Sequence, residues 1–235
     1  MRINKYLATS GIASRRKADE LTRNGNVKVN GVTCHELGYD VKDGDVVEVN
    51  GITIAPSNRR VYVLLNKPLG YISTSSDEKN RPTVMDLVND IEERIFPVGR
   101  LDADTTGLLI MTNDGDFAYR LTHPSHETKK TYRARVFGVL SKERLYALRK
   151  GVDIGGFTTA PAEVNIVKQA ARYAVVEISI HEGKNRQIRK MFASVGNKVL
   201  ELERIAIGDV KLANLKQGHY RKMKKNEIES LIGNE

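Results

Sequence analysis

The segment from Val98 to Asp114, VGRLDADTTGLLIMTND, constrains the fold more than any other part of the chain. It places two carboxylates and two threonines between Gly99 and Gly107, directly before an apolar run at 108–111. Glycine adopts backbone angles that are closed to other residues. A short apolar run that ends at the turn signal of 113–115 is typical of a buried strand. The segment therefore predicts an acid-bearing loop anchored to a core strand, and chemistry is commonly mounted on such loops.

Length and composition limit the class of protein. The chain has 235 residues, of which 40% are hydrophobic, so it can bury a substantial core in one or two domains. No apolar run is long enough to cross a bilayer, and the first residues lack the basic-then-apolar layout of a signal peptide. The lone Cys34 can form no internal disulfide, and no cysteine cluster could hold zinc. We therefore expect a cytoplasmic protein with no membrane partner and no metal.

Positive charge gathers in two separate regions of a chain whose formal net charge is +9. Residues 1–28 contain seven Lys or Arg and two acids, whereas residues 29–55 contain one Lys and five acids. Residues 181–225 contain twelve Lys or Arg and four acids. A small domain with one basic face, followed by a second basic region far along the chain, is typical of an extended footprint on nucleic acid.

The first fifty residues carry the signals of two helices followed by short strands. Apolar spacing predicts a first helix over 3–12. Ser14 is a suitable N-cap for a second helix, which runs through residues 15–21 and ends at the Asn-Gly pair of 24–25. Valines that alternate with polar residues, next to Asn-Gly and Asp-Gly turns, predict strands at 27–29 and 46–49.

This region resembles the small RNA-binding domain first found in ribosomal protein S-four. The matching residues are Arg2 with Lys5, SGIASRRK at 10–17, GNVKVNG at 25–31 and KDGD at 42–45, and they span nearly all of residues 1–52. The resemblance implies an S-four-like domain at 1–54 that contacts RNA through a basic cluster: Arg2, Lys5, Arg15, Arg16 and Lys17. The last three could instead be a solvated helix face, but their clustering with the first two favours RNA.

The rest of the chain has the pattern of a second, larger domain. The polar, proline-containing stretch at 55–60 has the composition of a linker, so we place this domain at 61–235. Its strand-like segments outnumber the helical ones and do not alternate with them regularly, which predicts an α+β fold instead of a doubly wound parallel sheet. The expected strands are 61–65, 71–75, 95–98, 108–111, 131–136 and 173–180, and the expected helices are 85–91, 142–148, 185–195 and 226–232.

Four segments of this second domain, in order along the chain, resemble the motifs of RNA pseudouridine synthases, in the branch that modifies ribosomal RNA. They are NKPLG at 66–70, GRLDADTTGLL at 99–109, KTYRA at 130–134 and EGKNRQIRKM at 182–191. The resemblance implies a mainly antiparallel mixed sheet flanked by helices, and an isomerisation of uridine to pseudouridine that needs no cofactor. It also implies four residue roles: Asp102 as catalytic acid, Tyr132 in the uracil pocket, Arg189 as the basic partner of the acid, and Arg100 as the side chain that enters the RNA helix vacated by the flipped base.

The chemistry of that reaction makes a single acid sufficient. The bond from N1 of uracil to C1′ breaks, the base rotates and C5 joins C1′, so nothing is consumed. An ionised carboxylate either attacks C1′ as a nucleophile or removes the C2′ proton, and the sequence leaves both routes open. Water must be kept away from the detached base. Stacking on Tyr132 would offset part of the cost of flipping the base, and the same side chain is a candidate acceptor for the C5 proton.

Each assignment has a plainer alternative. Asp102 could cap its own loop by accepting from backbone amides, and Tyr132 could be an ordinary strand aromatic. The four ordered motifs favour catalysis for both. On the helix expected at 185–195, Arg186 and Lys190 lie off the apolar stripe, and we expect them to contact phosphates unless they are simply solvated.

The target and the state of assembly are predicted from shorter patterns. NRQIR at 185–189 and YRLTHPSHE at 119–127 are more similar to large-subunit members of the branch than to small-subunit ones, so we expect large-subunit ribosomal RNA as the partner and substrate. The alternatives are small-subunit ribosomal RNA and a non-catalytic ribosome-assembly factor that binds RNA. No heptad pattern demands association, and we expect a monomer.

Overall fold

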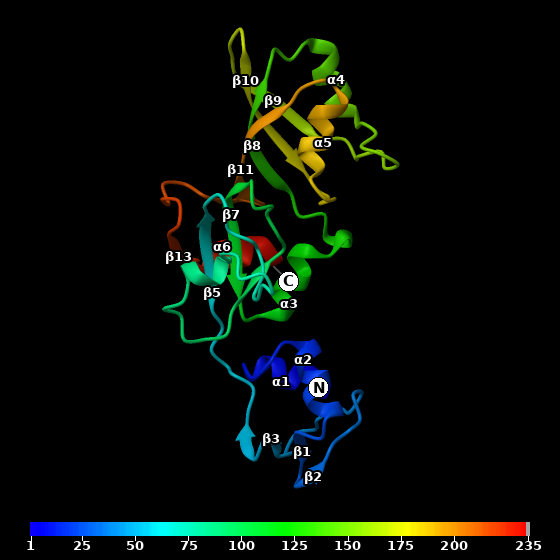
Figure 1. Cartoon of the computed structure of the whole chain (residues 1–235), viewed down its shortest axis with the longest axis vertical. Helices are drawn as coiled ribbons and strands as arrows, with labels where there is room; N and C mark the ends of the chain where they lie inside the picture. Colours follow the sequence, from blue (N-terminus) through cyan, green and yellow to red (C-terminus); the bar gives the residue numbers. More distant parts are fainter. Residues whose placement is uncertain (234–235) are drawn as a thin grey trace. The chain divides into compact units, whose positions relative to one another are not determined.

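Two units make up the chain in the computed structural model, which describes residues 1–233 (Figure 1). The N-terminal unit contains residues 1–61 together with 92–95 and 113–115, and the larger unit contains the other described residues. The domain limits expected from the sequence, 1–54 and 61–235 with a linker between them, stay a prediction. No helix within residues 1–233 has the length and hydropathy to span a membrane.

The N-terminal unit consists of two helices packed on a small antiparallel sheet. Its elements are α1 (Ile3–Thr9), α2 (Arg15–Arg23), β1 (Val27–Val29), β2 (Val32–Thr33), β3 (Val47–Val49) and β4 (Ile52–Ile54), with strand order β2-β1-β3-β4. Ser14 caps α2, because its hydroxyl accepts a hydrogen bond from the Lys17 amide at 3.2 Å. Ile3, Leu7 and Val27 are fully buried where the helices meet the strands. The predicted order of two helices followed by strands is therefore confirmed for this unit, and β2 and β4 are further strands that the sequence did not predict.

A nine-stranded mixed sheet forms the framework of the larger unit. Its strand order is β13-β5-β7-β11-β8-β10-β9, with β6 added to β7 and β12 added to β11. The bounds are β5 (Tyr62–Lys67), β6 (Phe96–Val98), β7 (Thr106–Thr112), β8 (Lys130–Phe137), β9 (Glu163–Gln169), β10 (Tyr173–Ile180), β11 (Val199–Ile207), β12 (Val210–Lys211) and β13 (Tyr220–Lys222). Neighbouring strands pair antiparallel except for β7 with β11. The predicted α+β class with a mainly antiparallel mixed sheet is therefore confirmed.

Helices lie beside this sheet in two groups (Figure 1). α3 (Gly115–Thr122) and α6 (Lys225–Ile232) lie near β5 and β7, and α4 (Lys142–Lys150) and α5 (Gln187–Ser194) lie near β8, β9 and β10. Phe117 and Leu121 of α3 pack in one core cluster with Leu108 of β7. On α5 the expected apolar stripe is buried, since Met191 and Phe192 are fully inaccessible to solvent.

The parallel contact between β7 and β11 lies at the centre of the fold. All seven residues of β7 are buried, and Gly107 is paired with Arg204 of β11. A Cβ atom at position 107 would lie 2.3 Å from the Arg204 main-chain oxygen and 2.7 Å from its nitrogen. The φ angle of Gly107 is +105°, which other residues rarely adopt. Glycine is therefore required here for two reasons, and the close approach places Arg204 beside the start of β7.

Some elements differ from the sequence-based expectation. The segment 71–75 forms no strand and contributes only a single bridge, between Ile72 and Thr83. The helix expected at 85–91 is reduced to the 3-10 turn η1 (Val84–Leu87), and α1 ends at Thr9 instead of reaching Ile12. The strands β9, β11, β12 and β13 and the helix α3 were not expected from the sequence. The strand β9 lies at the edge of the sheet and most of its residues are exposed, so it lacks a continuous buried face.

Candidate active site

A buried lysine holds the backbone of the acid-bearing loop in place. Lys67, at the end of β5, is fully buried, and its Nζ donates to the main-chain oxygens of Pro68 and Thr105, both at 2.9 Å. The Gly70 amide donates to the Ala103 oxygen at 2.8 Å. Within the loop, the Thr105 amide also donates to the main-chain oxygen of Asp102 at 3.0 Å. The NKPLG motif therefore fixes the backbone on which Asp102 is mounted.

Burial changes the acid–base properties of this lysine. Desolvation lowers the pKa of Lys67 to about 8, and the negative charges of Asp104 and Asp102 act in the opposite direction. A buried ammonium group is costly unless its protons are used, and the two carbonyl bonds use them in part. The contacts of Lys67 with the main chain give it a structural role in shaping the acid-bearing loop.

Asp102 lies at the surface of the larger unit beside a guanidinium. Its side chain is 36% exposed, and its Oδ2 lies 3.8 Å from Nη1 of Arg186. The expected dry surroundings of this carboxylate are therefore not formed by the protein alone. Asp102 nevertheless has the basic neighbour that the chemistry requires, contributed by the residue just before α5.

Asp104 lies closer than Asp102 to the guanidinium of Arg186, and it also contacts Arg189. Arg186 binds it in a bidentate manner, with Nη1 and Nη2 at 3.0 and 2.9 Å from the two carboxylate oxygens. Arg189 Nη2 lies 3.3 Å from Oδ2 of Asp104 and donates to its main-chain oxygen at 2.7 Å. The hydrogen bond from Arg186 is the main reason why the pKa of Asp104 is lowered. Asp104 was not among the residues to which the sequence assigned a role.

The structure differs from the expected pairing of Arg189 with Asp102. The Arg189 side chain is only 14% exposed, and the carboxylate that it contacts belongs to Asp104. Arg186 is the guanidinium that lies near Asp102. The reason is geometric: Arg186 precedes α5 with a left-handed φ of +53°, whereas Arg189 lies almost one turn later and meets the loop backbone. Lys190 is exposed on the same helix.

Tyr132 and Arg100 line a pocket of about 470 Å³ in the larger unit. Tyr132 is buried on β8, and the Arg204 guanidinium carbon lies 6.0 Å from the centre of its ring. Asp102 is not among the residues that line this pocket. The structure therefore brings together Tyr132 with Arg100, and Asp102 with Arg186, but it does not place all the expected residues in one cavity.

Sequence reasoning missed three basic residues of this pocket, Lys130, Lys184 and Arg204. Arg204 is 3% exposed and donates from Nε to the Leu108 oxygen at 2.7 Å. The signal that points to Lys130 is its position two residues before Tyr132, because residues i and i+2 of a strand share one face. Arg204 has no comparable local signal, since it reaches the pocket through the β7–β11 contact.

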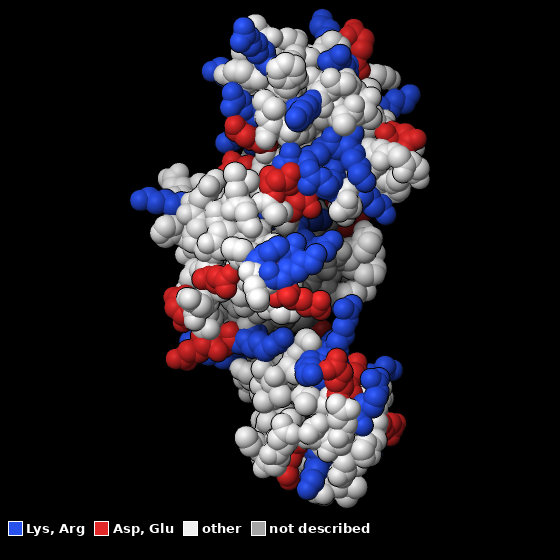
Figure 2. All heavy atoms as spheres, viewed as in Figure 1, with Lys and Arg blue, Asp and Glu red and all other residues white. Residues whose placement is uncertain are grey.

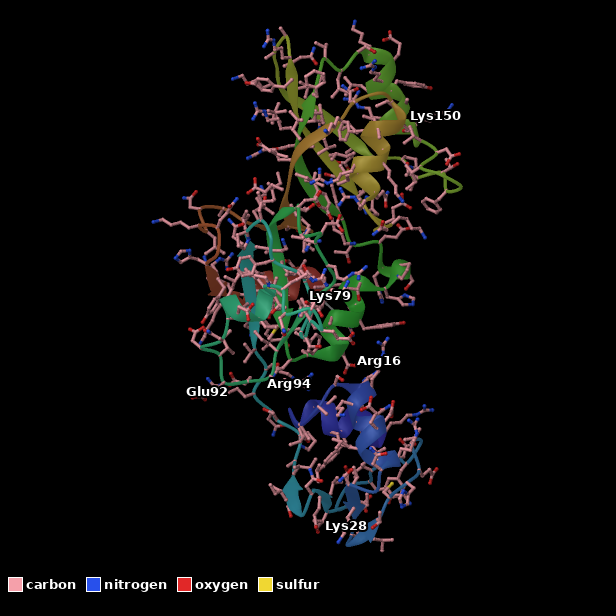
Figure 3. All side chains as sticks on the ribbon, in the orientation of Figure 1. Arg16, Lys28, Lys79, Glu92, Arg94 and Lys150 are labelled. Atoms are coloured by element: carbon pink, nitrogen blue, oxygen red, sulfur yellow. The ribbon has the colours of Figure 1, made fainter. Side chains whose placement is uncertain are left out.

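The basic residues expected to bind RNA in the N-terminal unit lie at its surface. Arg2, Arg15, Arg16 and Lys17 are exposed, and Lys5 is half-buried. Lys17 forms an ion pair with Glu20 at 2.7 Å, whereas Arg15 and Arg16 form none within residues 1–233. Figure 3 shows Arg16 and Lys28 at opposite ends of this unit, so the basic face belongs to the helices and does not include β1.

The larger unit carries both signs of charge side by side. Figure 2 shows Lys and Arg side chains gathered over part of its surface, with Asp and Glu side chains directly next to them. The contacts of Asp102 and Asp104 with Arg186 and Arg189 are an ion-pair network of this kind. Such a surface presents positive charge to a polyanion while two carboxylates keep the arginines in place.

Comparison with known proteins identifies the family. The chain matches the RNA pseudouridylate synthase family over residues 61–194 and the S4 domain family over residues 1–47. It is 43% identical to ribosomal large subunit pseudouridine synthase B of Bacillus subtilis (strain 168), over 98% of this chain and 95% of that protein. It is 38% identical to the dual-specificity RNA pseudouridine synthase RluF of Escherichia coli (strain K12), over 99% of this chain and 78% of that protein. A crystal structure of pseudouridylate synthase matches 98% of this chain and 99% of its own, with a TM-score of 0.70 and 30% identity. Together with the acid-bearing loop, these similarities show that the chain belongs to the RNA pseudouridylate synthase family.

Proposed function

We propose that the protein isomerises uridine to pseudouridine in ribosomal RNA, with the RNA of the large subunit as its substrate. The observation that carries the proposal is the 43% identity, along almost the whole length of both chains, to an enzyme named for the large subunit. The S4 domain match adds an RNA-binding module at the N-terminus. Because one relative is named a dual-specificity enzyme, activity on a second class of RNA is one of the outcomes that the test distinguishes.

Asp102 is proposed as the catalytic acid because of how its loop is built. The loop backbone is fixed by Lys67 and Gly70, so the carboxylate is presented by a rigid support instead of by a mobile segment. Its Oδ2 lies 3.8 Å from Arg186, which supplies positive charge beside it. Attack on C1′ and removal of the C2′ proton both remain possible roles for such a carboxylate.

The remaining residues are proposed to bind and position the RNA. Tyr132 offers an aromatic wall to the flipped base, and Arg100, in the same pocket, is placed to take the position that the base leaves. Arg189 positions the loop through the main-chain oxygen of Asp104. Basic side chains hold phosphates on the two units: Arg2, Lys5, Arg15, Arg16 and Lys17 on the first, and Arg186 and Lys190 on the second.

The domain limits, the state of assembly and the location complete the proposal. We infer an RNA-binding domain at 1–54, a linker at 55–60 and a synthase domain at 61–235. We also infer that the protein acts as a monomer in the cytoplasm on ribosomal RNA. The family reaction rearranges atoms that are already present in the substrate, so no cofactor is included in the proposal.

The test is a tritium-release assay on ribosomal RNA transcripts labelled at C5 of uridine. Isomerisation replaces the C5–H bond by the C5–C1′ bond, so each turnover must release one label to water. We expect release from large-subunit RNA and none from small-subunit RNA, and no release with Asp102→Asn. Release from small-subunit RNA alone would overturn the substrate assignment. Tight RNA binding without any release would identify a binding factor, and free uracil among the products would identify a hydrolase.

A further inference from the structure

Two basic side chains of the pocket around Tyr132 have no acidic partner. Arg204 is 3% exposed, its Nε donates to the Leu108 oxygen, and its Nη2 is buried without any hydrogen-bond partner. Lys130, half-buried at the start of β8, donates from Nζ to the Thr128 oxygen at 3.0 Å. Within residues 1–233, neither side chain forms an ion pair with a carboxylate. The pocket therefore contains positive charge that the protein itself does not neutralise.

The two cations also disfavour one another. Burial lowers the pKa of Lys130, and the positive charge of Arg204 lowers it further. Placing unpaired charges in a low-dielectric setting is costly, and proteins normally avoid it by pairing them. Because Arg204 and Lys130 line the same pocket without an acidic partner, we infer that the pocket binds an anion that is not part of the protein.

The walls of the pocket indicate which kind of anion fits. They combine apolar side chains and aromatic rings with the basic groups, including Val98, Leu121, Tyr132, Phe157 and Ile207. Two carboxylates, Glu127 and Glu182, also line the pocket, together with four Lys or Arg residues. A phosphate group would lose much of its hydration against apolar walls. A flat ring that carries negative charge on its carbonyl oxygens and ring nitrogen fits both the walls and the cations.

The isomerisation generates such an anion. When the bond between N1 and C1′ breaks, its electron pair stays on uracil, which becomes an anion delocalised over N1 and the two carbonyl oxygens. The sugar is balanced in either route: Asp102 forms a bond to C1′, or it takes the C2′ proton while C1′ and C2′ become doubly bonded. The anion must then be retained until C5 joins C1′ and the C5 proton leaves.

We propose that Arg204 and Lys130 stabilise the detached uracil anion and retain it in the pocket during its rotation. The inference rests on the proposed function, and it assigns to these two residues a role in the step between bond cleavage and bond formation. Charges that are already in place before the anion forms need no reorganisation when it appears, and burial of the Arg204 side chain strengthens its electrostatic effect. Tyr132 provides the ring contact, and Arg204 lies against that ring.

The experiment uses the full-length protein and an RNA substrate with two labels, tritium at C5 of uridine and carbon-14 in the uracil ring. The variants are Lys130→Met and Arg204→Gln, which remove charge while keeping similar length. Lys129→Met is the matched control, because Lys129 is the preceding residue but pairs with Glu163 at 2.6 Å. Loss of a preorganised stabilising group costs about a hundredfold in rate. We therefore expect Lys130→Met and Arg204→Gln to lower the single-turnover rate by about 10- to 100-fold, to release free labelled uracil, and to leave RNA affinity unchanged.

Charge-preserving variants separate electrostatics from structure. Lys130→Arg and Arg204→Lys are expected to recover much of the rate and to stop the release of uracil. If Arg204→Gln fails to fold, the Lys130 variants alone decide the question, since Lys130 is only half-buried. A rate equal to that of the Lys129→Met control would overturn the inference. Weaker RNA binding with a lower salt dependence and an unchanged single-turnover rate would also overturn it, because it would identify a phosphate contact. If the wild-type protein releases no tritium from any ribosomal RNA, the proposed function itself fails.

Discussion

Arg189 donates from Nη2 to the main-chain oxygen of Asp104 at 2.7 Å and lies 3.3 Å from the carboxylate of the same residue. Asp104 is two positions beyond Asp102, the residue proposed as the catalytic acid. Arg189 therefore contacts the backbone of the acid-bearing loop, whereas Arg186 is the cation that lies 3.8 Å from Asp102. The two acids of the loop thus differ in their contacts: Asp104 forms ion pairs with Arg186 and Arg189, whereas Asp102 lies 3.8 Å from Arg186.

This division predicts different effects of the two amide substitutions. Asp102→Asn is expected to abolish tritium release while RNA affinity stays within about twofold, because the change removes a charge but little volume. Asp104→Asn is expected to slow turnover without abolishing it, since it frees Arg186 and loosens the loop. Single-turnover rates of the two variants at saturating enzyme check this. Complete loss of turnover with Asp104→Asn, together with retained activity of Asp102→Asn, would show that Asp104 is the catalytic acid and Asp102 the supporting one.

The ion pair of Asp104 also predicts a dependence on pH. Its pKa is lowered chiefly by the hydrogen bond from Arg186, so the folded state binds the Asp104 proton less readily than the unfolded chain does. The stabilisation is present above the ordinary carboxyl range and is lost as the pH falls through the lowered pKa. Urea denaturation of wild type and Asp104→Asn between pH 7 and pH 3 is expected to show the difference shrinking as the pH falls. Because Asp104 is 48% exposed, the difference is expected to be small and sensitive to salt.

Gly107 is expected to tolerate no side chain. A Cβ atom there would meet the Arg204 backbone at 2.3 Å, and the φ of +105° adds strain. We expect Gly107→Ala to lower the free energy of unfolding by at least about 3 kcal/mol, through overpacking and backbone strain together. Gly99→Ala is the matched control, because its φ is also positive but its nearest neighbour is 3.6 Å away. It is expected to cost about 1–2 kcal/mol. Equal losses in urea denaturation would show that the approach of β11 is not the limiting contact.

Lys67 predicts a rise of stability with alkaline pH. Its folded-state pKa of about 8 lies below the ordinary lysine value of 10.5, so between these values the unfolded chain binds more protons. The free energy of unfolding is therefore expected to rise from pH 8 to about pH 10, by at most about 1.4 kcal/mol per pH unit from this group. Lys67→Met removes this contribution, and it also leaves the Thr105 oxygen without its donor. The difference between wild type and Lys67→Met, measured by urea denaturation at several pH values, isolates the group. A difference that does not change with pH would contradict the assignment.

The exposed arginines of α2 are expected to contribute to RNA binding. Arg15→Ala combined with Arg16→Ala is expected to weaken binding of ribosomal RNA and to reduce the slope of log affinity against log salt by about one for each lost phosphate contact. Lys28→Ala, at the other end of the N-terminal unit, is the control and is expected to change neither quantity (Figure 3). Equal slopes for all variants in filter-binding titrations would mean that these arginines are only solvated.

Elements with local signals could be predicted from the sequence. The Ser14 cap placed α2 correctly, and the apolar run at 108–111 marked the buried strand β7 that follows the acid-bearing loop. These features depend on residues within a few positions of one another, because capping and burial periodicity act over one or two turns. The ordered motifs also gave the family, since their spacing is a property of the chain itself.

Only the tertiary structure decided which groups meet at the site. Arg204 donates to Leu108 across 96 positions of sequence, and Arg189 meets Asp104 across 85 positions. No local pattern encodes such contacts, because they depend on how the tertiary structure places β11 and α5 relative to the acid-bearing loop and β7. Asp102 and Asp104, two positions apart on one loop, differ in how closely they approach the arginines, and spacing alone could not distinguish them. The sequence by itself determined the family and the elements that have short-range signals, whereas packing determined which charged groups are paired, because those contacts join residues far apart in the chain.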